Sequence, residues 1–236
     1  MKSLTQQTLR VNSFRPAPPQ PDKEPDIKHT FQDFVKDHPC LGAHSVFNLN
    51  NYEIGVYSQL GDRTSTIGLS RDLLKFIQQR PSNSKDLYSF LAVFPETPKL
   101  SETQFEEKLW DQLSKLSEID REPWDYSVSS DPNDPNFSFS FGGKAFYVIG
   151  LHPDSSRKAR RFAYPMMVFN YHEQFERLRN NGVYSKMRDK IRSRDIKYSG
   201  SVNPMLKDFG EASEARQYSG RQVGNEWKCP FLNKSN

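Results

Sequence analysis

The chain has 236 residues and a formal net charge of +4, with 33 Lys and Arg residues against 29 Asp and Glu residues. This length is enough for one large domain with its own core and is marginal for two. The charge is too small to argue for nucleic-acid binding by itself. No long apolar run is present, so we expect no membrane-spanning helix. The two cysteines do not require a disulfide, and we expect reduced thiols in a cytoplasmic protein.

The first part of the chain combines a Pro-rich segment with short predicted elements. Five prolines among polar neighbours in residues 1–28 predict a poorly ordered lead-in to a single domain at 29–231. In that domain, the pattern predicts a helix at 31–36 that ends before Pro39 and a buried strand at 88–94. It also predicts a hairpin of strands at 45–48 and 52–57 and a helix at 69–79.

The second part shows clearer periodicity. Residues 101–119 carry apolar side chains at spacings of three and four, and Ser101 with Gln104 offers a capping box. Residues 137–141 and 145–150 flank Gly142-Gly143, which predicts a second hairpin. The pattern then predicts a strand at 164–169 and a helix after it that can break at Gly182. We expect 232–236 to be a frayed tail. These elements predict an α+β fold, a mixed α/β sandwich in which one sheet with hairpins packs against several helices.

Residues 150–162 form a turn with a candidate anion site. A strand ends at Gly150, His152 follows it, and free backbone N–H groups, two serines and a basic cluster come next. These groups favour a carboxylate or a phosphate. The cationic candidates are Arg157, Arg160 and Arg161. A surface turn with a solvated basic face is the alternative.

His172 is a second candidate, because it lies at the start of the predicted helix after 164–169. The helix dipole disfavours added positive charge there, and neutral imidazole is the form that binds a metal or a heme iron. A partly buried histidine bonded to a neighbouring backbone group is the alternative.

A polar stretch at 199–221 lacks clear helical or strand periodicity, and an ordered loop of such length often carries function. Glu211 and Glu214 are candidates to bind a cationic group, and Arg216 and Arg221 an anionic one. A surface loop whose charges pair with each other is the alternative.

The two cysteines give weaker signals. Cys229 precedes Pro230, and Cys40 lies two residues after His38; a thiolate in such a place can be an axial heme ligand. The sequence contains no CxxC, HExxH, GxGxxG, Walker or GxSxG motif, so zinc sites, nucleotide loops and hydrolase elbows have no support.

Six blocks in fixed order carry a resemblance to a known family. They are 139–146, 150–157, 169–175, 201–204, 213–221 and 227–231, and Pro39-Cys40-x-Gly42-Ala43 adds an earlier match. Together they resemble the YqcI/YcgG family over most of the chain from about residue 30.

The resemblance implies a heme-dependent monooxygenase that N-hydroxylates a guanidino group of arginine or a related amino acid. It implies heme b, O₂, an electron donor and a heme iron held by a histidine. His152 and His172 lead as iron ligands, with His44 and His38 behind them. Arg157, Arg160 and Arg161 are candidates for the heme propionates or the substrate carboxylate. The expected substrate-binding residues are Asn203, Glu211, Glu214, Arg216 and Arg221.

Two other classes remain open at this point. One is a binding protein for heme or a small anion without turnover, which would use the same basic turn and histidines. The other, less favoured, is a nucleic-acid-binding protein that uses the basic residues between 154 and 197.

Overall fold

The computed structural model describes residues 26–231, and one five-stranded sheet organises them. The strand order is β1-β2-β5-β4-β3, where β1 pairs with β2 in parallel and the other neighbours are antiparallel. The strands are β1 (Tyr52–Val56), β2 (Ser89–Val93), β3 (Phe139–Phe141), β4 (Lys144–Leu151) and β5 (Met166–Tyr171). The expected α+β fold is confirmed. The Pro-rich lead-in up to residue 25 and the tail at 232–236 lie outside the described residues.

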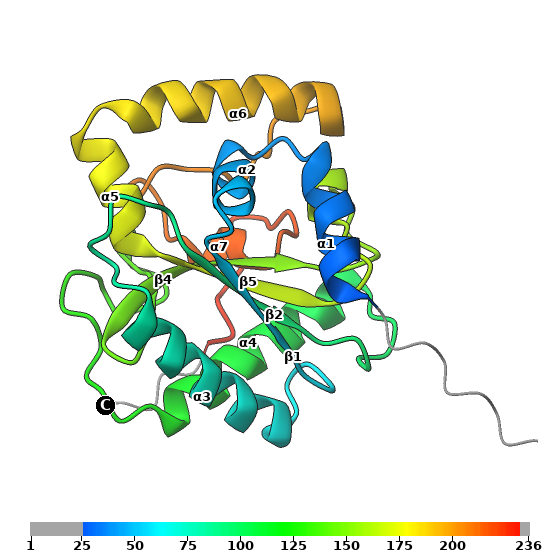
Figure 1. Cartoon of the computed structure of the whole chain (residues 1–236), viewed down its shortest axis with the longest axis vertical. Coiled ribbons are helices and arrows are strands. Elements are labelled where there is room, and N and C mark those ends of the chain that lie inside the picture. The colour runs from blue at the N-terminus through cyan, green and yellow to red at the C-terminus, as the bar shows by residue number, and fades with distance from the viewer. Residues whose placement is uncertain (1–25, 232–236) are drawn as a thin grey trace, which may run out of the picture.

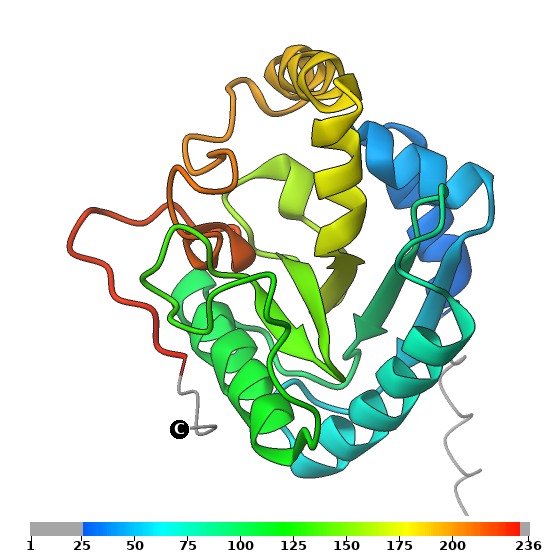
Figure 2. The ribbon, with the colours of Figure 1, turned by 90° about the vertical axis from the view of Figure 1, so that its left-hand side faces the viewer.

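Helices cover both faces of the sheet (Figures 1 and 2). One layer consists of α3 (Arg63–Gln79) and α4 (Glu102–Ile119). The opposite layer consists of α1 (Ile27–Lys36), α2 (Leu41–Asn48), α5 (His172–Asn180) and α6 (Val183–Ser199). Two short elements complete the fold, the 3₁₀ turn η1 (Lys158–Arg160) and α7 (Ala215–Tyr218). Among residues 26–231, no helix combines the length and apolar character needed to cross a bilayer.

The main core lies between the sheet and the α3–α4 layer. Successive strand side chains point to opposite faces, so Phe146, Phe169 and Tyr171 share this side and are all buried. The ring of Tyr171 stacks on Phe76 of α3 with centroids 5.3 Å apart. Because each buried aromatic side chain removes a large apolar area from water, this face supplies much of the folding free energy.

Several local predictions are confirmed. Ser101 accepts from the Gln104 N–H, and the Gln104 side chain accepts from the Ser101 N–H, which completes the capping box of α4. Strands β3 and β4 form the predicted hairpin around Gly142 and Gly143, whose φ angles are 60° and 69°. Gly182 has φ 65° and separates α5 from α6, since few other residues adopt this backbone without strain.

The first predicted hairpin is wrong. Residues 45–48 belong to α2 and form no strand, and β1 pairs in parallel with β2. The apolar pair Val46-Phe47 between Ser45 and Asn48 also suits a short helix, of which Val46 is the buried residue. Asn50, with φ 53°, then turns the chain into β1.

Other boundaries shift by a few residues. Helix α1 begins at Ile27 because Asp26 caps it by accepting from the His29 N–H. The strand predicted at 164–169 runs from Met166 to Tyr171, and the helix that follows it begins at His172.

Gly150 of β4 packs tightly against α4 and α7. A Cβ atom there would lie 2.6 Å from Leu109 and 2.9 Å from the carbonyl oxygen of Tyr218. We expect Gly150→Ala to lower the free energy of unfolding by about 1–3 kcal/mol through overpacking, measured by urea denaturation. Gly224→Ala is the matched control because nothing lies within 4 Å of its Cβ position. Equal stability of the two variants would contradict this packing.

Candidate functional site

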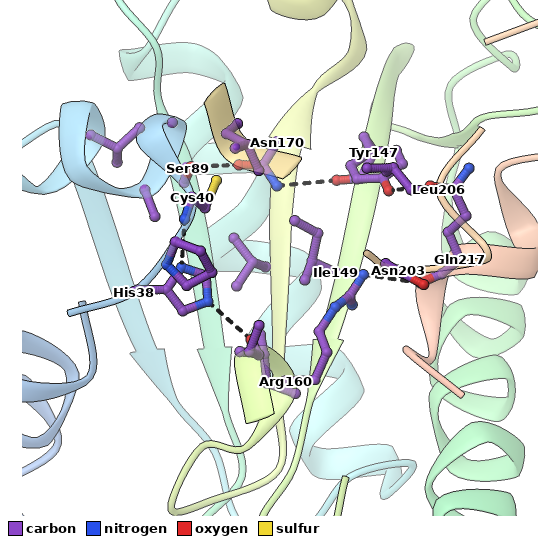
Figure 3. A pocket seen from close by; sticks show the side chains of 18 of the residues that line it. His38, Cys40, Ser89, Tyr147, Ile149, Arg160, Asn170, Asn203, Leu206 and Gln217 are labelled. Carbon is purple, nitrogen blue, oxygen red and sulfur yellow. Dashed lines mark hydrogen bonds between the residues drawn. The ribbon is translucent and has the colours of Figure 1, made fainter. Parts of the chain in front are cut away.

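A pocket of about 260 Å³ lies between the sheet and the layer of α1, α2, α5 and α6. The floor is made of side chains from three neighbouring strands, arranged in rungs. Ser89, Asn170 and Tyr147 are register partners and form a polar rung. The Ser89 hydroxyl donates to Asn170 Oδ1 at 2.6 Å, and Asn170 Nδ2 donates to the Tyr147 carbonyl at 3.3 Å (Figure 3). The next rung, two residues along each strand, is apolar: Leu91, Val168 and Ile149.

The other walls are mostly apolar. They come from α1, α2, α5 and α6, which cover this face of the sheet, and from the loop after α6. They include Phe31, Phe34, Val35, Val46, Phe175, Met187, Ile191 and Leu206. The loop after α6 closes one side, because Arg157 of the basic turn holds it. Arg157 donates to the Ser201 carbonyl at 3.0 Å and pairs with Asp195 of α6 at 2.6 Å. This buried ion pair fixes α6 over the pocket.

Arg160 lines the pocket, and the hydrogen-bond partners of its side chain are backbone carbonyls. The residue is 9 % exposed, and its guanidinium donates to the carbonyls of Gly150 at 2.9 Å, Gln217 at 3.2 Å and Tyr218 at 3.4 Å. No carboxylate within residues 26–231 forms an ion pair with it. Burial lowers the pKa of Arg160 below its ordinary value, yet a guanidinium stays charged in proteins. The pocket therefore holds a buried positive charge that forms no direct ion pair with an acidic side chain of residues 26–231.

The charge balance of the lining favours an anion. Five cations line the pocket: Arg157, Arg160, Arg179, Arg188 and Lys207. The lining carboxylates are Asp195 and Glu214. Three of the cations already have acidic partners, Asp195 for Arg157, Glu176 for Arg179 and Asp208 for Arg188.

Tyr147 belongs to the polar rung and bonds to Gln217, the residue of α7 whose carbonyl also accepts from Arg160. Its hydroxyl donates to Gln217 Oε1 at 2.7 Å. Burial is the main reason that its pKa lies well above the ordinary value, so the phenol stays protonated and acts as a hydrogen-bond donor at neutral pH.

His38 and Cys40 reach the pocket from the segment that joins α1 to α2. His38 Nε2 bonds to the Ala159 carbonyl at 2.9 Å, and its Nδ1 accepts from the Cys40 N–H at 3.2 Å. These two bonds fix a neutral ring with the proton on Nε2. Burial is the largest cause that lowers the pKa of His38 to about 4. Cys40 is a half-buried free thiol at the N-terminus of α2.

The two leading histidine candidates lie outside the pocket and far from each other. His152 follows the end of β4 and stacks on Phe105 of α4, on the other side of the sheet, with centroids 4.4 Å apart. His172 follows β5, and β4 and β5 are antiparallel, so the two histidines lie at opposite ends of the strand pair. Six residues at about 3.4 Å each separate these ends by roughly 20 Å. They cannot ligate one iron together.

The predicted anion site in the basic turn already holds a carboxylate from the chain itself. Glu102 Oε1 accepts from the N–H and the hydroxyl of Ser156, both at 2.8 Å. Arg161 lies outside the pocket and donates to the Ser155 carbonyl at 2.6 Å, which closes the turn. The donors of this turn therefore bind a carboxylate of the protein itself and stabilise the fold.

The predicted residues of the 199–221 stretch separate into two groups. Asn203 and Glu214 line the pocket. Glu211 is exposed and accepts from the Asp208 N–H, while Arg216 stacks over Trp227. Arg221 pairs with the buried Glu106 of α4 and so anchors the C-terminal segment. Of these three residues, only Arg221 forms an ion pair within residues 26–231, and its partner lies in α4, so the alternative of charges that pair within the loop is not what the structure shows.

Sequence reasoning missed much of the floor. Ser89, Tyr147 and Asn170 stand out only when the alternation of each strand is followed, since each is a polar group in a mostly apolar run. Gln217 and Asp195 carry no local signal, because long-range packing alone brings them to the pocket.

A heme held by histidine does not fit these residues. All five histidines lie in the described part of the chain, and His38 is the one that lines the pocket. Both of its ring nitrogens are occupied by hydrogen bonds. Residues 26–231 contain no group of three or more His, Cys, Asp or Glu side chains that could hold a metal ion. The volume of about 260 Å³ is also below the usual range of about 300–1,000 Å³ for drug-sized ligands.

Cys229 does not supply a thiolate ligand either. It does not line the pocket, and burial raises the pKa of its thiol to about 12. Both cysteines are free, which confirms the expected absence of a disulfide between them.

Residues 26–231 therefore form an α+β fold with a pocket between a mixed sheet and the layer of α1, α2, α5 and α6. The YqcI/YcgG family model matches residues 28–232, and the chain belongs to this family. It is 24 % identical to the uncharacterized protein YcgG of Bacillus subtilis over 216 residues, 87 % of this chain and 85 % of that protein. It is 29 % identical to the uncharacterized protein YqcI of the same organism over 211 residues, 84 % of this chain and 82 % of that protein. No solved structure matches the chain.

The low pKa of His38 predicts a pH dependence of stability. An unfolded histidine titrates near 6.5 and folded His38 near 4, so the unfolded state binds more protons between these values. Stability is full above pH 6.5 and decreases as the pH falls towards 4, by up to about 3 kcal/mol. We expect His38→Gln to flatten this part of the profile of unfolding free energy against pH. His29→Gln, at an exposed site, is the control; superimposable profiles of wild type and His38→Gln would refute the assignment.

Proposed function

We propose that the pocket binds a small molecule with an apolar body and one carboxylate or phosphate group. The buried, uncompensated guanidinium of Arg160 carries this proposal. Its bonds to Gly150, Gln217 and Tyr218 use three of five N–H donors, and within the described residues two donors remain for a ligand. A charge-assisted bond at a buried site is about twice as strong as a neutral one.

The rest of the lining supports the same class of ligand. The Leu91–Val168–Ile149 rung and the aromatic side chains of α1 provide an apolar surface. The polar rung at the other end supplies an amide and hydroxyl groups that can orient a second functional group. A few polar groups in a mainly apolar cavity are typical of small-molecule sites.

A second proposal is the reaction implied by the family resemblance, heme-dependent N-hydroxylation of a guanidino group with O₂ and an electron donor, in the cytoplasm. One observation favours a guanidino amino acid as ligand. Asp195 Oδ1 is buried without a hydrogen-bond partner and belongs to a lining residue, so the pocket offers a carboxylate oxygen as well as Arg160. Such a ligand carries both complementary charges. Since the pocket histidine does not fit an iron, we derive no step of this reaction from the residues.

Binding of matched eight-carbon probes tests the first proposal. We expect octanoate to bind more tightly than octylammonium or octanol in isothermal titration calorimetry. We expect Arg160→Met to weaken octanoate binding by about 10- to 100-fold, because a hydrogen bond to a charged group contributes about 1.5–3 kcal/mol.

Two further variants keep this test interpretable. Arg160→Met leaves three carbonyls without a donor and costs stability, so Arg160→Lys provides a folded variant that keeps the charge but loses the planar fork. Arg216→Met removes a guanidinium outside the pocket and should leave binding unchanged. Equal affinity for the three probes, or full affinity in Arg160→Met, would rule the proposal out.

The second proposal predicts a Soret band when hemin is added to the folded protein, and hydroxyarginine from arginine, O₂ and a reductant. His38→Gln and Cys40→Ser identify the ligand in the pocket, because a histidine-held and a thiolate-held heme differ in spectrum. A folded protein that shows no Soret band with hemin excludes this reaction.

A further inference from the structure

Glu214 connects the pocket to a histidine behind its wall. It lines the pocket and is buried, and its Oε2 accepts from the hydroxyls of Ser138 at 3.0 Å and Tyr218 at 3.3 Å. Its other oxygen, Oε1, lies 3.7 Å from Nδ1 of His172. Both hydroxyls also lie 3.1 Å from the Phe146 carbonyl, so they share their hydrogens between it and Glu214 Oε2, whereas Glu214 Oε1 faces the imidazole.

His172 continues the connection to the surface. Its side chain is 4 % exposed, and its Nδ1 is buried without a hydrogen-bond partner in the described part of the chain. Its Nε2 lies 3.3 Å from Oε1 of Glu176, whose side chain is 36 % exposed. The imidazole therefore bridges a pocket carboxylate and a solvent-accessible carboxylate.

The charged groups around His172 favour a proton on it when an anion enters the pocket. Glu176 and Arg179 approach from α5, Glu214 from the N-terminus of α7, and the uncharged ring of Phe209 packs against it from the loop. Arg179 pairs with Glu176, so the pocket-side charge that remains is that of Glu214. Arg160 and Glu214 both line the pocket, so an anionic ligand on Arg160 adds a second negative charge to a partly dry site, where like charges repel.

We infer that His172 takes up a proton from solvent through Glu176 when the pocket binds its anion, and returns the proton when the anion leaves. The proton arrives at Nε2, and the Nδ1–H then faces Glu214 Oε1, which offsets the repulsion between Glu214 and the ligand. An imidazole suits this role because each of its two opposite nitrogens can bind a proton. The inference rests on the proposed anion-binding function and adds its regulation by pH.

Proton uptake can be counted directly by titrating octanoate in two buffers of different ionisation enthalpy, at several pH values from 6 to 8. We expect the wild-type protein to take up close to one proton per octanoate in the upper part of this range. Its affinity for octanoate should then fall by up to tenfold for each unit by which the pH is raised. In His172→Gln the uptake should vanish and the affinity should become independent of pH.

His152→Gln is the matched control, because His152 is an equally buried imidazole at the other end of the β4–β5 pair. It should keep the uptake of the wild type. Octanoate binding without proton uptake in the wild type, or unchanged uptake in His172→Gln, would overturn this inference and leave the proposed function standing. If octanoate does not bind at any pH, the proposed function itself fails and the inference fails with it.

Discussion

The buried guanidinium of Arg160 is the interaction on which both the fold and the pocket depend. It links the end of β4 to α7 through backbone carbonyls. Gly220 has φ 82° and no side chain, and a Cβ there would lie 3.1 Å from Arg160 Cγ, so a glycine lets the chain pass over the arginine stem. Burial of a charge is costly unless its donors find acceptors. Carbonyls satisfy part of that need, and the proposed anionic ligand would satisfy the rest.

One face of the sheet is closed by side-chain packing, and the other face carries the pocket. The α3–α4 face is closed by aromatic packing, for example Trp110 on Tyr218 with centroids 5.5 Å apart. The other face is covered by a helix layer that leaves a cavity above the strand rungs. The Arg157–Asp195 pair ties α6 of this layer to the basic turn, and Glu214 lies between the pocket and His172. A ligand bound here therefore contacts groups from nearly every part of the chain.

Local patterns predicted the elements that depend on local contacts. The capping box fixed the start of α4, and paired glycines fixed the β3–β4 hairpin. The strand prediction at 45–48 is wrong because a short apolar run does not distinguish a strand from a short helix, and tertiary packing decides between them. The basic neighbours of Arg160 mark it as a candidate cation in the sequence, whereas its proposed role in anion binding depends on its burial. His38 could not be placed beside Ala159, 121 residues away, because no local pattern encodes that pairing.

The most direct measurement is a crystal structure of the protein with octanoate bound. The account predicts the carboxylate within hydrogen-bond distance of the Arg160 guanidinium and the hydrocarbon chain along the Leu91–Val168–Ile149 rung. A carboxylate bound elsewhere on the molecule, or a hydrocarbon tail against the guanidinium, would contradict the claim that an uncompensated buried cation defines this pocket.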